Sequence, residues 1–298
     1  MPTRRALLGG LSGMAAAGAA GGGYAVWIEP ALRLTVAEHR ITPEGWPAGR
    51  SLTIAALSDI HAADPWMPLR RVEQIVAATN ALRPDMVALL GDFPPSRRMM
   101  PYAVPMAELA AALGGLRAPL GVHTVLGNHD WWEDAEVQRL RGGIPDAARI
   151  FADAGLPVLH NAARKVGPPG AQLWVAGLGS LWAFRGRGGF VGAHDLPRAL
   201  DAVTDADPVV LLCHEPDIFP DVPSGRVAVT LCGHTHGGQV RLLGYSPIVP
   251  SRYGNRYAWG HVVERGKHLV VSGGLGWTIM PVRFGVPPEI TLVRLGHG

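Results

Sequence analysis

The amino-acid sequence predicts an α/β protein with one large layered domain, and three observations lead to this prediction. From residue 52 onward, short aliphatic runs alternate with segments of helical periodicity, as in layered α/β domains. Hydrophobic residues make up 48% of the 298 residues and charged residues only 17%, below the roughly 25% of ordinary soluble domains, which excludes a disordered chain. The 39 glycines and 26 prolines are scattered between apolar runs, which indicates many loops joining short elements.

The expected strands are mostly apolar along their whole length, so both faces of each should be buried. They cover residues 52–57, 86–90, 123–126, 173–176, 209–213, 227–232, 269–272 and 290–295. Helical spacing of apolar residues over 69–82, closed by Pro84, makes the first connection a β-α-β unit. Further helices are expected over 106–113 and 147–154, each followed by glycine. No repeat or low-complexity linker follows residue 30, so residues 31–298 are interpreted as a single catalytic domain.

Residues 1–30 resemble a twin-arginine (Tat) export signal. Arg4 and Arg5 precede a weakly hydrophobic stretch that runs to about Ile28, and this order is typical of such signals. Small residues at 17–19 offer a cleavage site, but the same stretch could be retained as a membrane anchor, or could be a plain Ala-rich helix. The signal would make the Tat machinery a partner and place the protein in the periplasm or at the outer face of the cytoplasmic membrane.

Charge argues against nucleic acid as a partner. The formal net charge is +3, and Arg4 and Arg5 supply two of these charges, so the rest of the chain is nearly neutral and lacks a basic stripe. The two cysteines, Cys213 and Cys232, provide no disulfide framework. We expect both to be buried strand residues, with a disulfide between neighbouring strands as the alternative.

Clusters of polar side chains follow the apolar strands, at the end where open α/β sheets bind their ligands. Any one of them is typical of a turn or a helix cap, but five at strand ends indicate a metal site. They are Ser58-Asp59-Ile60-His61, Gly91-Asp92, Gly127-Asn128-His129-Asp130, His214-Glu215-Pro216-Asp217 and Gly233-His234-Thr235-His236-Gly237-Gly238.

The ordered set Asp-X-His, Gly-Asp, Gly-Asn-His-Asp, His and Gly-His-Thr-His resembles that of the calcineurin-like metallophosphoesterase superfamily, over about residues 52–295. The stretches 233–239 and 273–290 are similar to those of Tat-exported bacterial phosphodiesterases. The resemblance implies a four-layer α-β-β-α sandwich, in which two mixed sheets are flanked by helices.

The resemblance also implies two divalent metal ions. One ion would be held by Asp59, His61 and His236, the other by Asn128, His214 and His234, and Asp92 would bridge them. Carboxylate, imidazole and amide donors suit Mn²⁺, Fe²⁺ or Zn²⁺. Such a pair can clamp the attacking and leaving oxygens of a displacement, with hydroxide between the ions as the expected nucleophile. Because the histidine ligands must be neutral, acid should release the ions.

Two further residues of the third cluster would serve catalysis. By the resemblance, His129 donates a proton or a hydrogen bond to the substrate or the leaving group. Asp130 is placed to orient His129, but it could instead, or also, cap a helix that opens near Trp131.

Substrate contacts are expected from the segment 182–190, where Arg185 and Arg187 lie in a glycine-rich loop flanked by aromatics. They could bind phosphate or be merely solvated, and Arg97-Arg98 is a similar, weaker candidate. Tryptophans near the motif loops could line an apolar groove, which keeps a lipid-like substrate and membrane association open, or could simply pack. These are Trp66, Trp131, Trp132, Trp182 and Trp277.

The sequence therefore predicts a dinuclear metal-dependent phosphoesterase that hydrolyses phosphodiester or phosphomonoester bonds outside the cytoplasm. One alternative is a pyrophosphatase acting on a nucleotide-linked or lipid-linked envelope substrate. The other is a metal-binding interaction module that uses the same fold without turnover.

Overall fold

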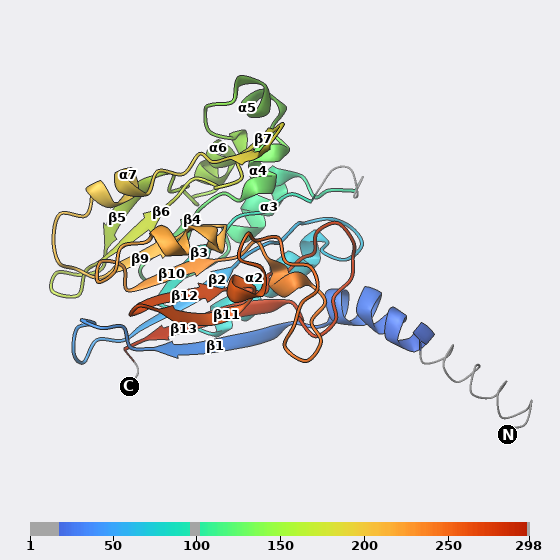
Figure 1. The fold of residues 1–298 in the computed structure, drawn as a ribbon, viewed down its shortest axis with the longest axis horizontal. Coiled ribbons are helices and arrows are strands. Elements are labelled where there is room, and N and C mark those ends of the chain that lie inside the picture. Colours follow the sequence, from blue (N-terminus) through green and yellow to red (C-terminus); the bar gives the residue numbers. More distant parts are fainter. Residues whose placement is uncertain (1–17, 96–101, 297–298) are drawn as a thin grey trace, which may run out of the picture.

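Two β-sheets lie face to face in the computed structural model, which describes residues 18–95 and 102–296 (Figure 1). The first sheet has the order β1-β13-β2-β3-β4, formed by Thr35–Ile41, Glu289–Leu295, Leu52–Leu57, Met86–Leu89 and Val122–Thr124. The second has the order β11-β12-β10-β9-β6-β5, formed by Gly260–Glu264, Lys267–Val271, Val229–Cys232, Val209–Leu212, Leu173–Gly177 and Ala162–Val166.

Both sheets are mixed. Strands β2, β3 and β4 run parallel, as do β12, β10, β9 and β6. Antiparallel pairs join β13 to β2, β11 to β12 and β5 to β6. Because the parallel strands end at the same edge of their sheet, the loops that follow them gather there.

Successive side chains of each central strand pack into different hydrophobic cores on the two faces of its sheet. In β2, Ile54 and Ala56 pack into the cluster shared by the two sheets, whereas Ala55 and Leu57 pack into the cluster formed with the helices. Successive strand side chains point to opposite faces, so a strand between two apolar layers needs apolar residues at every position. This is why the continuous apolar runs marked the central strands.

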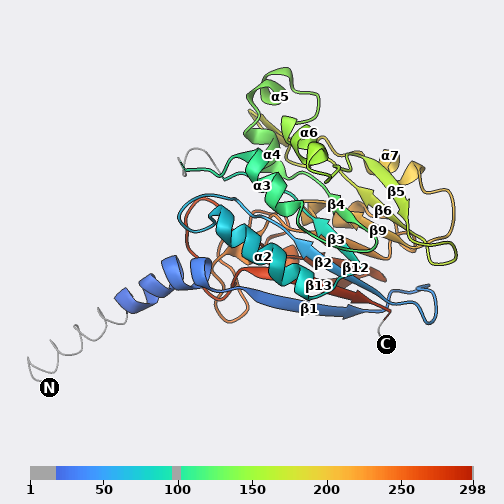
Figure 2. The same cartoon turned by 180° about the vertical axis from the view of Figure 1, so that it is seen from behind.

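Helices cover the outer faces of the sandwich (Figure 2). The first sheet is covered by α2 (Leu69–Ala81), α3 (Met106–Leu113) and α6 (Asp146–Asp153). Over the second sheet lie α7 (Leu196–Asp201) and the 3₁₀-helix η2 (Pro216–Asp221). The predicted α-β-β-α sandwich of two mixed sheets is thereby confirmed.

The strands that sequence reasoning missed lie at sheet edges. β1, β5 and β11 each pair on one side only, and β1 alternates between half-buried and exposed positions. An edge strand with one solvated face carries polar residues at every second position and so lacks a continuous apolar run.

The segment predicted as a flexible glycine-rich loop is instead a β-hairpin, so this prediction was wrong. β7 (Phe184–Gly186) pairs antiparallel with β8 (Gly189–Val191), and Gly189 has a φ of 131°, which glycine adopts most readily. Strands of three residues are too short to show a period in the sequence.

A helix precedes β1 and rests on the loops of the first sheet. It spans residues 18–32 and becomes a π-helix, η1, over Tyr24–Leu32. The carbonyl of Ala25 accepts a hydrogen bond from the Arg283 amide, and the buried Glu29 carboxylate accepts one from the Val286 amide (2.9 Å). Within residues 18–95 and 102–296, no helix has both the length and the apolar character needed to cross a bilayer. Arg4, Arg5, Arg97 and Arg98 lie outside the described residues.

Candidate metal centre

The loops at the carboxyl ends of β2, β3 and β10 have an unusual backbone. Within them, five residues adopt positive φ angles: Asp59 (55°), His61 (44°), Asp92 (57°), His234 (70°) and His236 (51°). Such angles are uncommon outside glycine and cost about 1–3 kcal/mol each where the residue is poorly suited to them. Strain of this kind concentrates at functional sites, where the surrounding structure holds it in place.

Two glycines allow the loops to approach each other closely. A Cβ added to Gly233 would lie 1.8 Å from Ser58 Oγ, and one added to Gly127 would lie 2.4 Å from Asp92 Oδ1. Any side chain at either position would therefore push an acidic loop out of place, which explains the glycines within the Gly-His and Gly-Asn motifs.

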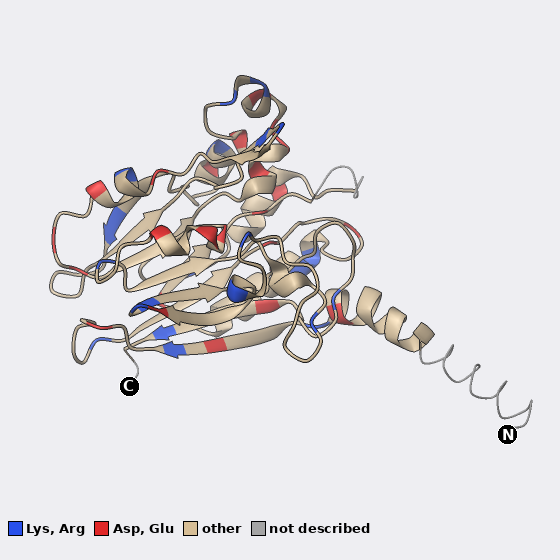
Figure 3. Cartoon of the chain, in the orientation of Figure 1, with Lys and Arg blue, Asp and Glu red and all other residues tan. Residues whose placement is uncertain are grey.

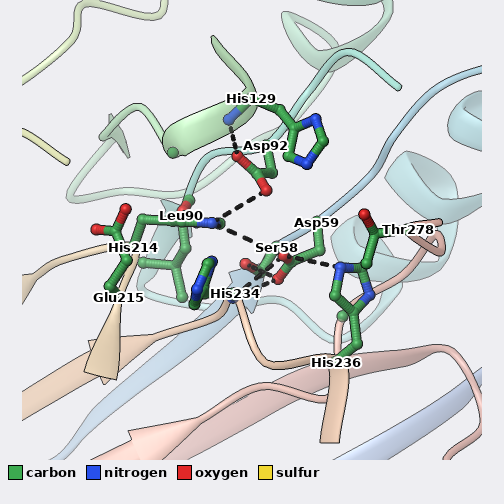
Figure 4. Close-up of polar contacts among 12 residues, drawn as sticks. Ser58, Asp59, Leu90, Asp92, His129, His214, Glu215, His234, His236 and Thr278 are labelled. Carbon is green, nitrogen blue, oxygen red and sulfur yellow. Dashed lines mark hydrogen bonds and ion pairs between the residues drawn. The ribbon is translucent and has the colours of Figure 1, made fainter. Parts of the chain in front are cut away.

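The first group of converging side chains consists of Asp59, His61 and His236. Figure 4 shows Asp59 and His236 turned toward each other. The Nε2 atoms of the two histidines lie 3.3 Å apart, and His236 Nε2 lies 3.3 Å from Asp59 Oδ1. Two atoms that bind one ion at about 2.0–2.2 Å lie roughly 3–3.5 Å from each other. The spacing of this group therefore suits a single divalent ion.

The second group consists of Asp92, His214 and His234, again with ligand atoms close together. Asp92 Oδ2 lies 3.2 Å from His214 Nε2 and 3.7 Å from His61 Nε2 of the first group. The carboxylate of Asp92 thus faces both groups, as the bridging position predicted for it requires. Asn128 is also buried next to this group, at the start of α4 (Asn128–Trp132).

Main-chain carbonyls orient two of the imidazoles. His61 Nδ1 donates to the carbonyl of Pro94 (2.9 Å), and His214 Nδ1 donates to the carbonyl of Leu90 (2.7 Å). Each ring therefore turns its Nε2 atom toward the centre, which is the usual arrangement around a metal-binding histidine.

Unsatisfied polar atoms test whether a metal fits here. Asn128 Oδ1 and at least one ring nitrogen of His234 are buried and lack a hydrogen-bond partner among the described residues. A buried polar group without a partner costs about 1–3 kcal/mol, so several in one place call for a ligand. Nitrogen and oxygen donors in two adjacent groups fit a pair of divalent cations.

The catalytic candidate His129 lies beside this centre, and Asp130 beneath it. The backbone amide of His129 donates to Asp92 Oδ1 (2.7 Å), its ring lies 4.9 Å from that of His61, and its Nδ1 has no partner among the described residues. The Asp130 carboxylate accepts hydrogen bonds from the amides of Gly127 (2.7 Å), Asp92 (2.9 Å) and Phe93 (3.2 Å). Asp130 thus closes the first turn of α4 and holds the Asp92 loop, and its carboxylate binds backbone amides rather than the His129 ring.

The two arginines of the β7–β8 hairpin lie differently. Arg185 places its guanidinium 4.3 Å from the ring centroid of Trp132, which itself lies 5.1 Å from the ring of His129. Arg187 lies at the exposed turn of the hairpin. Only Arg185 therefore has contacts that lead to the metal centre.

A pocket of about 420 Å³ opens next to the second ligand group. Its walls are Trp182 and Phe190 on one side and residues 249–252 on the other. The rings of Trp182 and Phe190 stack at 4.7 Å, and Trp182 also contacts the ring of His234 edge-on at 4.4 Å. The pocket thus joins an aromatic wall to a candidate metal ligand.

A family model described as calcineurin-like phosphoesterase matches residues 52–238. The chain belongs to the calcineurin-like phosphoesterase family. The matched residues carry all five polar clusters, from Asp59 to His236, so the family is recognised on the part of the chain that forms the site.

Known relatives agree. "Uncharacterized metallophosphoesterase YkuE" of Bacillus subtilis is 31% identical over 98% of this chain and 97% of its own. "Phosphodiesterase YaeI" of Escherichia coli is 27% identical, covering 81% of both chains. "Transmembrane protein with metallophosphoesterase domain" of Danio rerio is 28% identical over 82% of this chain, which spans about half of that relative (53%). The prediction of a metal-dependent phosphoric ester hydrolase is confirmed.

Burial and opposite charges set the pKa values of the metallophosphoesterase centre. Burial would raise the pKa of Asp92, but the neighbouring His214 outweighs it and holds that pKa well below the ordinary value. Burial would likewise lower the pKa of His214, but Asp92 raises it well above the ordinary value. Burial lowers the pKa of His129 to about 4 and that of His234 to about 3, so both are neutral at pH 7. Burial and the charge of Asp92 raise the pKa of Asp130 to about 7.

Metal loading at pH 7 is expected to release about one proton from His214. The Asp92 carboxylate raises the pKa of His214 well above its ordinary value, which favours a proton on the imidazole, and an ion at Nε2 must displace that proton. We would titrate chelator-treated enzyme with Mn²⁺ by calorimetry in buffers of different ionisation enthalpy. The variant His268→Ala, outside both ligand groups, should release the same amount, and binding enthalpies independent of the buffer would contradict the protonation of His214.

Two supporting residues escaped sequence reasoning. Arg283 is fully buried, donates to the carbonyls of Gly276 (2.7 Å from Nε) and Val286 (2.8 Å), and lies 3.3 Å from His236 Nδ1. Burial lowers the pKa of Arg283 to about 10, so it remains cationic and disfavours protonation of His236. The buried Glu215 accepts from the Leu181 amide (2.9 Å) and the Ser180 hydroxyl, which positions the Trp182 loop. The only sequence signal was their place inside motif stretches.

The cysteines and the tryptophans singled out in the sequence lie either in the buried core or near the surface of the molecule. Cys213 and Cys232 are free and buried, as expected of small strand residues. Trp131 is fully buried in the core, whereas Trp132 and Trp182 stack on Phe190. Trp66 and Trp277 contact each other away from that wall. Two of the five tryptophans therefore line the neighbourhood of the site.

Proposed function

We propose that this metallophosphoesterase hydrolyses phosphodiester or phosphomonoester bonds with a pair of Mn²⁺, Fe²⁺ or Zn²⁺ ions, and that it acts outside the cytoplasm. The observation that carries the proposal is Asp92, whose carboxylate faces two groups of ligand atoms at once. Two divalent cations bound there would act as Lewis acids on a phosphoryl group and lower the pKa of water.

The residues of the chain would position the substrate around those ions. Asp59, His61 and His236 would hold one cation, and Asn128, His214 and His234 the other, with Asp92 shared. His129 presents an unpartnered Nδ1 next to Asp92, from which it can donate a hydrogen bond to a phosphoryl or leaving-group oxygen. The Arg185 guanidinium, stacked on Trp132, supplies positive charge at the same side of the site.

The experiment that tests the reaction uses two aryl esters. The purified chain would be assayed on bis-p-nitrophenyl phosphate and p-nitrophenyl phosphate after chelation, and again with added Mn²⁺ or Zn²⁺. Turnover that requires the metal supports the proposal, and the diester-to-monoester ratio identifies the preferred bond. Absence of turnover on either ester with two ions demonstrably bound would refute it.

Removal of Arg185 is expected to raise KM for phosphomonoesters by about tenfold, because a charge-assisted contact to a dianionic phosphate is lost. The matched change at the exposed hairpin turn, Arg187→Met, should alter KM less than twofold. Steady-state kinetics of Arg185→Met and Arg187→Met on p-nitrophenyl phosphate would distinguish them. Equal KM values for Arg185→Met and the wild-type enzyme would show that Arg185 is merely solvated and does not bind the phosphate.

The proposal of export depends on the amino-terminal sequence. Arg4 and Arg5 followed by an apolar stretch support export by the twin-arginine route, to the periplasm or to the outer face of the cytoplasmic membrane. Exchange of both arginines for lysine should leave the protein in the cytoplasm, as cell fractionation with a cytoplasmic marker would show. Unchanged export of Arg4→Lys/Arg5→Lys would exclude this route.

A further inference from the structure

Large apolar side chains are exposed on two loops that follow the metal-binding motifs. In the loop over 240–250, Leu243 is fully exposed, Ile248 is 76% exposed and Tyr245 is 62% exposed. In the loop over 277–284, Ile279 is 67% and Met280 56% exposed. Scattered apolar residues at a surface are ordinary, but a contiguous group marks an interaction site.

The two loops are joined to each other. Val240 forms a parallel bridge with Phe284, and the Arg241 amide donates to the Phe284 carbonyl (2.8 Å). The Gln239 side chain donates to the carbonyl of Met280 (3.2 Å) and accepts from the Thr278 amide (2.6 Å). The apolar side chains of both loops therefore belong to one surface.

The same surface continues onto the amino-terminal helix. The ring of Tyr24 contacts that of Phe284 edge-on, and the Ala25 carbonyl accepts from the Arg283 amide. Trp27 and Ile28 on this helix are 46% and 44% exposed. In both views, the helix projects from the molecule beside the two loops (Figures 1 and 2). We call the two loops and residues 24–28 the apolar face.

The backbone at two tips of the apolar face gives no folding reason for these side chains. Leu243 has a φ of 50° and Ile279 a φ of 64°, angles at which glycine or asparagine is the ordinary choice and a β-branched residue is an outlier. Both side chains are exposed, so packing within the described chain does not compensate for the strain. Packing inside the fold therefore does not account for the apolar character of these tips, whereas a contact outside the fold would.

Charge on the apolar face has one sign. The loops over 240–250 and 277–284 contain Arg241 and the buried Arg283 but neither Asp nor Glu, whereas Arg252 and Arg256, beyond the first loop, pair with Asp217 and Glu264. Figure 3 shows the helix beside the loops almost without charged residues. The Arg241 guanidinium contacts the neutral Ser246 and Asn255 and lies over the ring of Trp259, and it forms no ion pair within the described residues. Apolar tips combined with arginine and without acidic residues are what a bilayer surface with anionic lipids attracts.

We propose that the apolar face docks on an anionic lipid bilayer, with the side chains of Leu243, Ile248 and Ile279 entering the interface. A bilayer fits better than a protein partner because the apolar residues lie at protruding loop tips and continue onto an apolar helix that leads to residues 1–17, whose only charges are Arg4 and Arg5. Gln239 lies three residues after His236, so docking would bring the metal centre to the lipid headgroups. This proposal goes beyond hydrolysis itself and concerns where the enzyme works.

A fluorescent label tests the contact directly. In the full chain, Leu243→Cys would be labelled with an environment-sensitive dye, and Leu140→Cys on α5 (Ala135–Leu140), where Leu140 is 57% exposed, would be the control. The natural cysteines are fully buried and should not react. With vesicles of phosphatidylcholine and phosphatidylglycerol, we expect a blue shift at position 243 and none at 140. Vesicle binding without a shift at 243 would mean that another part of the chain makes the contact, and would overturn the proposal.

Substitution separates docking from hydrolysis. Leu243→Ser/Ile248→Ser/Ile279→Ser should weaken vesicle partitioning at least about tenfold. Leu140→Ser/Ile144→Ser/Val263→Ser, at three residues that are also exposed, by 51–57%, but lie elsewhere, should weaken it less than twofold. Both variants should hydrolyse soluble aryl esters like the wild type, so failure of the proposed function would appear in that assay alone. Unchanged partitioning of the first variant, or its loss of a dimer that the wild type forms without lipid, would overturn membrane docking.

Discussion

Asp92→Asn is expected to lower kcat/KM at least about a thousandfold, or about 4 kcal/mol in transition-state stabilisation. The carboxylate is buried, accepts from the His129 amide through Oδ1 and turns Oδ2 toward His214 and His61. Asparagine preserves the shape but removes the negative charge and one acceptor oxygen. Its NH₂ group would face either the His129 amide or the ring nitrogens, so at least one ion should bind more weakly.

Metal content measured by plasma mass spectrometry, alongside aryl ester kinetics, checks this expectation. Asp217→Asn is the matched control, because Asp217 is also a buried aspartate that accepts from a hydroxyl and an amide, those of Ser251 and Arg252. It lies outside both ligand groups and should retain two ions. A full complement of metal and normal turnover in Asp92→Asn would remove Asp92 from the bridging position.

The central strands of the fold could be predicted from the sequence because their burial on both faces leaves a pattern in consecutive residues. A strand buried on both faces must be apolar throughout, so the run 52–57 marked β2 with its observed bounds. An exposed edge such as β1 follows a different rule, since its position is fixed by pairing with β13 at the far end of the chain. Sequence periodicity alone does not contain that information.

The residues of the site also differ in whether the sequence alone could reveal them. The ligand candidates could be found because their residue types are unusual at strand ends. The structure brings together Asp59, His61, Asp92, His214, His234 and His236, and it buries Asn128 next to His129, whose amide binds Asp92. The carbonyls of Leu90 and Pro94 could not be found, because every residue has one. Arg283 was equally hidden, since its contact with His236 spans 47 residues. Positioning groups of this kind are defined by the fold and not by their residue type.

The position of the apolar face could not be predicted from the composition of the chain. The Tat-like amino terminus suggested a separate segment, yet the described helix holds Glu29 against the Val286 amide and its neighbours contact the loop of Arg283. The loop of Arg283, which supports the candidate metal ligand His236, is thus held in place by the helix that leads to the amino terminus. Hydropathy averaged along the chain does not show that exposed leucine and isoleucine gather beside this helix.

His129→Ala should lower kcat by about 10²- to 10⁴-fold while both ions remain bound, because general acid catalysis contributes this much. The imidazole is neutral in the free enzyme at pH 7, so this role requires the anionic phosphate of the bound substrate to raise the pKa of His129. The Nδ1 atom of His129 has no hydrogen-bond partner among the described residues, and the His129 backbone amide, which binds Asp92, survives the substitution. Metal analysis and kinetics on p-nitrophenyl phosphate would be compared with those on an ester of a more basic alcohol. The loss should be larger for the basic leaving group, because that group needs a proton more.

His160→Ala provides the control for removing an imidazole near the same helix, since His160 contacts Trp131 and lies outside the ligand groups. It should leave the dependence on the leaving group unchanged. If His129→Ala instead lost its metal together with its activity, His129 would be supporting the ion pair and not the leaving group. If the rate fell equally for both esters with metal retained, the ring would bind the phosphoryl oxygens without transferring a proton to the leaving oxygen, because only proton transfer depends on the basicity of that oxygen.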